Sequence, residues 1–151
     1  MSAWVSAASS SWAREPGQHV APRSNGAGRL YHRSVPAAAD CLFCRIVAGE
    51  IPTDFLHEDE LVVAFSDISP KAPTHILLIP REHIVSAAQL TESHAPLLGR
   101  LFATAGRLAA ERGLVESGFR LVTNAGPEAG QSVDHLHVHL LGGRKFGWPP
   151  G

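Results

Sequence analysis

The stretch D H L H V H L at residues 134–140 constrains the fold most, because three histidines alternate there with apolar residues. Successive side chains of a β-strand point to opposite faces of the sheet, whereas a helix would spread these residues around its axis. As a strand, the stretch places His135, His137 and His139 on one face and the apolar residues between them on the other. An ordinary half-buried strand could use threonine or lysine equally well. The repeated imidazole, whose charge changes near neutral pH, therefore favours a functional surface.

Length and charge limit which classes of protein this chain can belong to. A chain of 151 residues suits one domain with a substantial core. Its 13 Lys and Arg nearly balance 14 Asp and Glu, so no broad basic surface indicates nucleic acid or an anionic membrane. No apolar run approaches the roughly 20 residues that span a bilayer. We therefore expect neither partner, although a local site can still bind a small anion.

Residues 1–38 differ in composition from the rest of the chain. They are rich in Ala, Ser, Gly, Pro and Arg, and Glu15 is their only acidic residue. Such a segment buries too little apolar surface to offset its ordering entropy, which predicts disorder. The same composition is also typical of a transit peptide, which would direct the chain to a mitochondrion or plastid instead of the cytoplasm. A start codon assigned too early, with Val35 as the true initiator, is the third interpretation.

Strand patterns begin after this extension. Apolar runs at 61–67 and 75–80, separated by a turn with two prolines, predict adjacent antiparallel strands. Another strand is expected at 118–124, ahead of the histidine strand.

One long helix is predicted over residues 91–113. Thr91 is a plausible N-cap, Pro96 is tolerated in the first turns, and apolar residues recur at i, i+3, i+4 spacing. A shorter helical turn is expected near Cys44–Val47. Strands gathered around one long helix indicate an α+β fold.

The run N A G P E A G Q S V D H L H V H L L G G R and the terminal G W P P G carry a family signature. They resemble the histidine triad (HIT) superfamily, and within it the Hint-type purine nucleoside phosphoramidases. The stretch D I S P K A P T H I L L I P R E H is of the same type, so the resemblance covers residues 40–151. It implies a HIT domain over 39–151, with a five-stranded antiparallel sheet and one long and one short helix. It also implies a two-fold dimer whose sheets join into one of ten strands.

The resemblance implies that His137 is the nucleophile. Neutral imidazole is a good nucleophile at physiological pH, and a covalent nucleotidyl-histidine splits one difficult displacement into two easier ones. His139 is expected to bond a phosphate oxygen and to assist the leaving group. His75 would orient His139, unless it is simply a satisfied histidine in an apolar strand.

Residues around the nucleophile match the family's nucleotide contacts. Gly130 and Ser132 match the phosphate and leaving-group contacts in the loop, where glycine lets backbone N–H groups approach developing charge. Asn124 matches a polar anchor, and Asp67 would accept hydrogen bonds from both ribose hydroxyls. The purine slot implied by the resemblance is formed by Leu42, Phe43, Ile46, Phe65 and Ile68, each of which alone would read as ordinary core.

Cys41 and Cys44 form a C x x C that fits a redox pair, half of a zinc site, or two ordinary thiols. Zinc needs two more nitrogen or sulfur ligands for a tetrahedron. His83 and His135 match the positions that complete such a site in zinc-bearing members of the superfamily. The ion would brace the structure, and catalysis would require no cofactor.

The favoured function is hydrolysis of purine nucleoside 5'-phosphoramidates, such as AMP joined to ammonia or to lysine. Cleavage of dinucleoside polyphosphates and a non-catalytic nucleotide-binding or regulatory role remain alternatives. Trp148 in the G W P P G tail is expected to lie against the partner chain near its active site. Asp134 should face the side of Leu136 by strand alternation.

Overall fold

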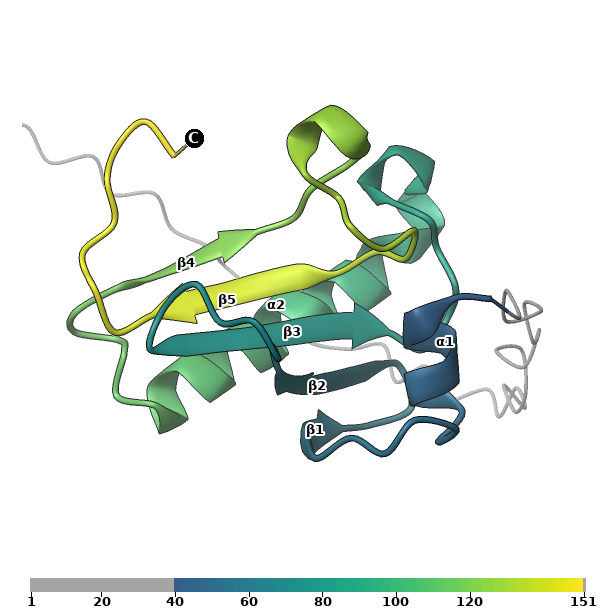
Figure 1. Ribbon diagram of the computed structural model, residues 1–151, viewed down its shortest axis with the longest axis horizontal. Coiled ribbons are helices and arrows are strands. Elements are labelled where there is room, and N and C mark those ends of the chain that lie inside the picture. The colour runs from purple at the N-terminus through teal and green to yellow at the C-terminus, as the bar shows by residue number, and fades with distance from the viewer. Residues whose placement is uncertain (1–39, 151) are drawn as a thin grey trace, which may run out of the picture. The chain divides into compact units, whose positions relative to one another are not determined.

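The computed structural model describes residues 40–150, which form one five-stranded sheet with two α-helices (Figure 1). The elements in chain order are α1 (Leu42–Val47), β1 (Phe55–Glu58), β2 (Val62–Ser66), β3 (Thr74–Pro80), α2 (Ala95–Glu111), β4 (Phe119–Val122) and β5 (Val138–Gly142). Three short 3-10 turns lie at Ala87–Gln89, Glu92–His94 and Pro127–Ala129. The strand order is β1-β2-β3-β5-β4, and all neighbours are antiparallel. The predicted α+β fold is confirmed, whereas the extension predicted over 1–38 lies outside the described residues.

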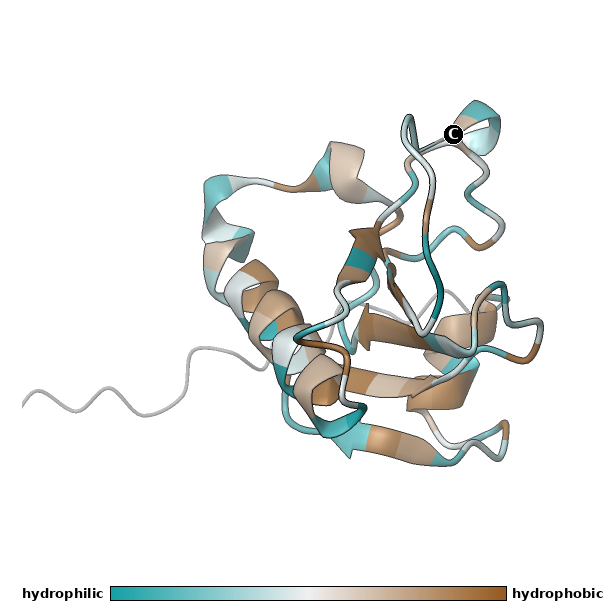
Figure 2. Cartoon of the chain, turned by 90° about the vertical axis from the view of Figure 1, so that its left-hand side faces the viewer, coloured by the Kyte–Doolittle hydropathy of each residue, from teal (hydrophilic) through white to brown (hydrophobic). Residues whose placement is uncertain are grey.

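Each face of the sheet is covered by one of the two helices (Figure 1). The larger core lies under α2 and joins its Leu97, Leu101, Ala105 and Leu108 to Val62, Ala64, Ile76, Leu78, Val138 and Leu140 of the strands. The smaller core packs Phe43 and Ile46 of α1 on Val63, Phe65, Leu77 and Ile79. Figure 2 shows the strands as hydrophobic over most of their length. Burial on both faces explains why β2 and β3 read as continuous apolar runs.

The long helix begins four residues later than the sequence pattern predicts. Thr91 does cap a helical segment, but that segment is the 3-10 turn Glu92–His94, and α2 starts at Ala95. The backbone N–H of Thr91 donates to Nδ1 of His94 at 3.0 Å, so one of the orphan donors of this end is satisfied. Pro96 then occupies the first turn of α2, where its missing N–H costs no bond. Within residues 40–150, neither helix has the length and apolar character of a membrane span.

The histidine strand also begins later than the alternation predicts. β5 starts at Val138, so His135 and His137 precede it. The cause lies in the backbone, because the N–H of Leu136 donates to the carbonyl of Ile84 at 2.5 Å and not to β3. This bond ties the approach to β5 to the segment that follows β3.

The side chains keep their predicted faces despite this shorter strand. Leu136 and Leu140 lie in the core under α2. The rings of His135 and His137 pack edge-on against Phe43 of α1, with centroids 5.8 and 5.4 Å away. The alternation therefore predicts the faces correctly even where the backbone leaves the ladder.

The edge strand β1 has no periodic pattern of its own, and only the family resemblance implied a fifth strand. Its four residues read F L H E, and the register with β2 shifts between Phe55 and His57. Other elements bury the side chains of β1, because Phe55 packs on the smaller core and Leu56 packs on the larger core. A strand this short is stabilised by its neighbours and is not recognisable from local sequence.

Candidate functional site

His137 and His139 lie side by side on the face of the sheet that carries α1. Their ring centroids are 4.9 Å apart at an interplanar angle of 74°. His139 belongs to β5 and pairs with Leu77 of β3, which faces the smaller core. His137 is almost fully buried, and its ring stands edge-on to Phe43. The structure therefore brings the predicted nucleophile and its predicted assistant into contact.

A backbone carbonyl determines the tautomer of His137. Nδ1 of His137 lies 2.7 Å from the carbonyl oxygen of His135. A carbonyl can only accept, so Nδ1 carries a proton, and in the neutral ring Nε2 keeps the lone pair. Among the described residues, no enclosed side-chain nitrogen or oxygen lacks a hydrogen-bond partner. Nε2 of His137 has no protein partner there, so this nitrogen is not completely enclosed although the residue is 3 % exposed, and its lone pair is uncommitted.

A backbone amide determines the tautomers of His75 and His139 in the opposite sense. The N–H of Lys71 donates to Nδ1 of His75 at 3.1 Å, so His75 carries its proton on Nε2. That Nε2 lies 2.8 Å from Nδ1 of His139 and 3.5 Å from Oδ2 of Asp67. Nδ1 of His139 must therefore accept, and His139 offers an N–H at Nε2. The prediction that His75 orients His139 is thus given a geometric basis.

The charges of this histidine pair follow from burial. Desolvation lowers the pKa of His75, although the carboxylate of Asp67 opposes the shift. Burial, followed by the nearby His137 and His75, lowers the pKa of His139 to about 4. Both rings are therefore neutral at pH 7, as the chain of hydrogen bonds requires.

The loop ahead of the histidines is shaped by glycine. Gly130 has φ +83°, a left-handed conformation that side chains rarely adopt. Nδ2 of Asn124 lies 3.5 Å from the carbonyl of Gly130, which ties the end of β4 to the loop. Ser132 is exposed after this turn. The three predicted contact residues therefore share one loop on the approach to His137.

Gln131 shapes the same loop and was missed in the sequence analysis. Its Oε1 accepts from the N–H of Gly126 at 2.9 Å. Its Nε2 donates to the carbonyls of Val85 and Val133 at 2.6 and 2.9 Å. One side chain thus joins both ends of the loop to the segment after β3. The only sign of this role in the sequence is a polar residue between Gly130 and Ser132. A glutamine at that position could equally have contacted the ligand.

The residues expected to hold the nucleoside divide into a buried and an exposed set. Phe43, Ile46 and Phe65 are buried in the smaller core, whereas Leu42 is 45 % exposed and Ile68 is fully exposed. The exposed pair is therefore accessible to a ligand, whereas the other three side chains are packed in the core.

Asp67, the predicted ribose acceptor, already has two protein contacts. Its Oδ1 accepts from the N–H of Ser69 at 2.7 Å, and its Oδ2 faces His75. Each carboxylate oxygen has a second lone-pair position, so capacity for ribose hydroxyls remains.

The four predicted metal ligands form one cluster. Sγ of Cys41 and Sγ of Cys44 lie 3.5 and 3.6 Å from Nδ1 of His135, and Sγ of Cys44 lies 3.2 Å from Nδ1 of His83. Zn–S bonds of about 2.3 Å and Zn–N bonds of about 2.0 Å place sulfur and nitrogen ligands about 3.5 Å apart in a tetrahedron. Nε2 of His135 donates to the carbonyl of Pro80 at 2.9 Å, which leaves Nδ1 for an ion. The residues therefore fit a structural zinc site.

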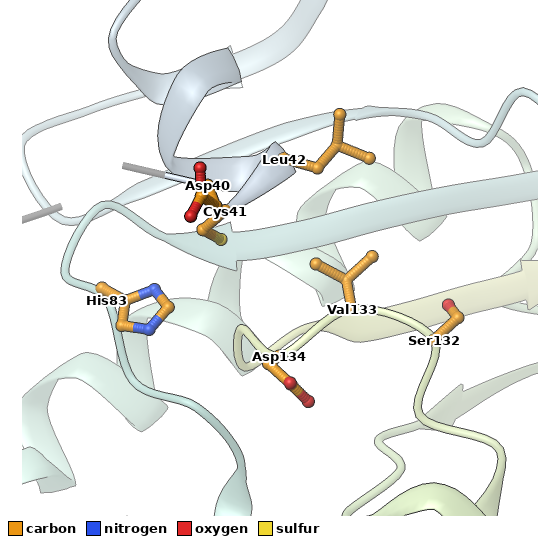
Figure 3. A pocket seen from close by; sticks show the side chains of 7 residues that line it. All are labelled: Asp40, Cys41, Leu42, His83, Ser132, Val133 and Asp134. Atoms are coloured by element: carbon orange, nitrogen blue, oxygen red, sulfur yellow. The ribbon is translucent and has the colours of Figure 1, made fainter. Parts of the chain in front are cut away.

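A hollow of about 460 Å³ borders this cluster (Figure 3). Its lining residues are Asp40, Cys41, Leu42, His83, Ser132, Val133 and Asp134. Figure 3 shows Cys41 and His83 toward one end and Ser132 toward the other. The prediction that Asp134 faces the side of Leu136 is wrong, because Asp134 is exposed at this hollow while Leu136 is in the core. Residues 133–135 form a bend, so strand alternation does not apply to them.

Comparison with known proteins decides the family. The HIT domain model matches residues 48–146. The chain belongs to the HIT-domain family. A 14 kDa zinc-binding protein of Brassica juncea is 49% identical over 114 residues, covering 74% of this chain and 100% of the relative. The purine nucleoside phosphoramidase of Escherichia coli K12 is 44% identical over 110 residues, covering 73% and 92%.

A solved HIT protein shares the architecture. The HIT family hydrolase from Legionella pneumophila Philadelphia 1 superimposes with a TM-score of 0.73 at 47% identity, covering 74% of this chain and 100% of that one. The predictions of a HIT fold and of a HIT-family hydrolase are therefore confirmed.

The lowered pKa of His139 makes stability sensitive to acid. The ordinary pKa of histidine is 6.5, whereas that of His139 in the folded chain is about 4. Between these values the unfolded state binds a proton that the folded state does not, so the free energy of unfolding falls as the pH is lowered through this window. We expect His139→Gln to flatten this dependence, measured by denaturant unfolding at about pH 7 and about pH 4.5. The other histidines remain in both proteins, so an equally steep dependence in the variant would contradict the neutral state of His139.

Proposed function

We propose that this HIT-family hydrolase cleaves purine nucleoside 5'-phosphoramidates through a covalent intermediate on His137. The observation that carries the proposal is the pair of opposite tautomers, a bare Nε2 on His137 beside an N–H on Nε2 of His139. A nucleophile and a hydrogen-bond donor on neighbouring rings are what displacement at phosphorus requires. The named phosphoramidase of E. coli, at 44% identity, supports this choice of substrate.

The first step transfers the nucleotide to the protein. Nε2 of His137 attacks phosphorus, an N–P bond to the ring forms, and the P–N bond to the amine breaks. The amine takes up one proton from solvent as it leaves, while the Nε2–H of His139 donates a hydrogen bond to the departing nitrogen. A neutral His139 supplies this hydrogen bond without giving up its only proton, since its pKa of about 4 keeps the ring uncharged at pH 7.

The second step returns the protein to its starting state. Water attacks phosphorus, the bond to Nε2 of His137 breaks, and the nucleoside monophosphate departs. The water restores the proton that the amine took, so the overall reaction is phosphoramidate plus water giving nucleotide plus amine. The Nδ1 bond to the carbonyl of His135 stabilises the charge that the ring carries while it holds the nucleotide.

The nucleotide would lie along the exposed edge of the smaller core. Asp67 would take the ribose hydroxyls, and the base would sit between the exposed Leu42 and Ile68 over Phe43 and Phe65. Ser132 and the backbone near Gly130 would meet the phosphate, because their loop leads directly to His137. The phosphorus would then lie beside the Nε2 atoms of the two histidines, neither of which has a protein partner within residues 40–150.

Replacing the nucleophile provides the direct test of this assignment. His137→Ala should lower kcat by at least about a thousand-fold, because the covalent route is lost. AMP binding, measured by calorimetry, should change little, since Asp67 and the apolar residues remain. Near-normal turnover would exclude His137 as the nucleophile, and absence of turnover in the wild type on phosphoramidates and dinucleoside polyphosphates alike would favour a binding role.

We also propose that Cys41, Cys44, His83 and His135 hold a structural zinc ion. The ligand distances fit a tetrahedron, and the relative from Brassica juncea is named as zinc-binding. Bound zinc would supply cross-linking between α1, the segment after β3 and the approach to β5. All four coordination positions would be filled by protein, so the ion would have no place for a substrate.

Metal analysis tests the zinc site. Purified protein should contain about one zinc per chain, and Cys41→Ser or His83→Ala should lose it together with thermal stability, because metal affinity in such sites couples to folding. His94→Ala is a matched histidine control, since His94 caps the turn ahead of α2 and does not belong to the cluster of the four proposed ligands. Equal zinc content in the control and in His83→Ala would contradict the assignment.

We further propose a two-fold dimer through the edge strand β4. This strand ends the sheet, and Phe119 on it is 37 % exposed. Phe102 of α2 and Val115 are 54 and 63 % exposed, and Trp148 of the tail is 86 % exposed. Pairing of two β4 edges would cover this apolar surface and extend the sheet to ten strands. The partner's active site would then receive the tail.

Sedimentation and truncation test this assembly. At micromolar concentration the chain should sediment as a dimer, and Phe102→Glu should shift it toward the monomer because a charge would enter an apolar contact. Truncation after Phe146 should alter leaving-group preference more than AMP affinity. A wild-type monomer would contradict the dimer, and unchanged selectivity would contradict the role of the tail.

A further inference from the structure

Arg144 connects the end of β5 to the loop that carries the histidine relay. Its Nε donates to the carbonyl of Lys71 at 3.2 Å, and its NH1 donates to the carbonyl of Lys145 at 3.1 Å. No carboxylate within residues 40–150 forms an ion pair with Arg144. Its guanidinium group is therefore committed to backbone carbonyls and not to charge neutralisation.

An aromatic ring keeps this guanidinium group in place. Arg144 lies over the ring of Phe146, with its Cζ 4.3 Å from the centroid. Arg120 of β4 lies over the same ring at 4.9 Å and donates to the carbonyl of Gly147 at 2.7 Å. Cation–π contacts reduce the conformational freedom of long side chains. The contact with Phe146 therefore fixes the orientation of Arg144 in addition to its hydrogen bonds.

The two segments that Arg144 joins are also in direct contact. Gly143 has φ +83°, and a Cβ built on it would lie 2.9 Å from Cβ of Pro73. Only glycine permits this approach, because a larger residue would push the loop away from the strand. The approach brings Arg144 within reach of Lys71, two residues before Pro73.

The peptide groups of Lys71 link this contact to catalysis. Its carbonyl accepts from Arg144, while its N–H donates to Nδ1 of His75. That N–H is the reason why His75 carries its proton on Nε2 and why His139 offers a donor toward the nucleotide. If Lys71 moves, His75 can place its proton on Nδ1, and the donor of His139 is no longer specified.

We propose that Arg144 is a positioning residue that acts through Lys71 and His75 to keep the Nε2 proton of His139 directed at the leaving group. The role in turnover rests on the proposed function, whereas the effect on tautomers does not. Arg144 is exposed, and its side chain contributes to neither apolar core. Its replacement should therefore alter the relay without unfolding the chain.

Ring nitrogen NMR on histidine-labelled protein tests the relay without any substrate. In the wild type, long-range proton–nitrogen correlations should show His75 and His139 protonated at Nε2. Arg144→Met should give a mixture of tautomers at both rings, and Arg144→Lys should do the same, because it keeps the charge but not the planar donor. Phe146→Leu, which removes the ring under Arg144, should shift the tautomers in the same direction by a smaller amount.

Leaving-group dependence tests the consequence for turnover. Arg144→Met should slow hydrolysis of an alkylamine phosphoramidate of AMP by about ten-fold or more, because an amine needs a proton to leave. Hydrolysis of AMP with a fluoride leaving group should change by less than about three-fold, since fluoride needs less protonation. The control is Arg112→Met, which removes an exposed arginine with no ion pair in residues 40–150 and should affect neither.

The outcomes separate the two proposals. Wild-type tautomers in both Arg144 variants, or equal loss on the two substrates, would overturn the positioning role. A wild type that shows the expected tautomers but hydrolyses neither substrate would contradict the proposed function and leave the relay standing.

Discussion

The proposed chemistry depends on which ring nitrogen carries the proton in each of two neighbouring histidines, His137 and His139. A neutral imidazole has one N–H and one lone pair, and each ring here has one nitrogen committed to the protein. The carbonyl of His135 takes the N–H of His137, and the relay that starts at the N–H of Lys71 takes the lone pair of His139. The two uncommitted nitrogens, on adjacent rings, are therefore a lone pair on His137 and an N–H on His139. The groups that determine the opposite tautomers are backbone groups, and the carboxylate of Asp67 lies beside the His75–His139 pair.

His135 contacts both proposed sites through different atoms. Its Nδ1 faces the two cysteine sulfurs, its Nε2 is bound to the carbonyl of Pro80, and its own carbonyl accepts from Nδ1 of His137. A disturbance of the metal cluster would therefore reach His137 through one residue of backbone. The hollow lined by Cys41 and His83 of this cluster also reaches Ser132 of the loop that leads to His137. The proposed zinc site and the proposed nucleophile are therefore neighbours that use different atoms of His135.

The sequence predicts those features that repeat along the chain. Alternation in H L H V H L placed the histidines and the apolar residues on their observed faces, and helical spacing found α2. The bounds of β5 and the position of Asp134 were missed, because the bond from Leu136 to Ile84 joins segments about fifty residues apart. The tautomers and the loop role of Gln131 were also beyond reach. They depend on which backbone group lies opposite a side chain, and no residue pattern encodes that distance.

The central claim is that the nucleotide becomes attached to Nε2 of His137. The most direct measurement is a rapid acid-free quench of wild-type protein with an AMP phosphoramidate, followed by mass spectrometry of the peptide that contains residues 134–146. The account predicts one adenylate on His137, labile in acid and absent from His137→Ala. Adenylate found on His139, or a burst of amine release with no nucleotide bound to protein, would contradict it.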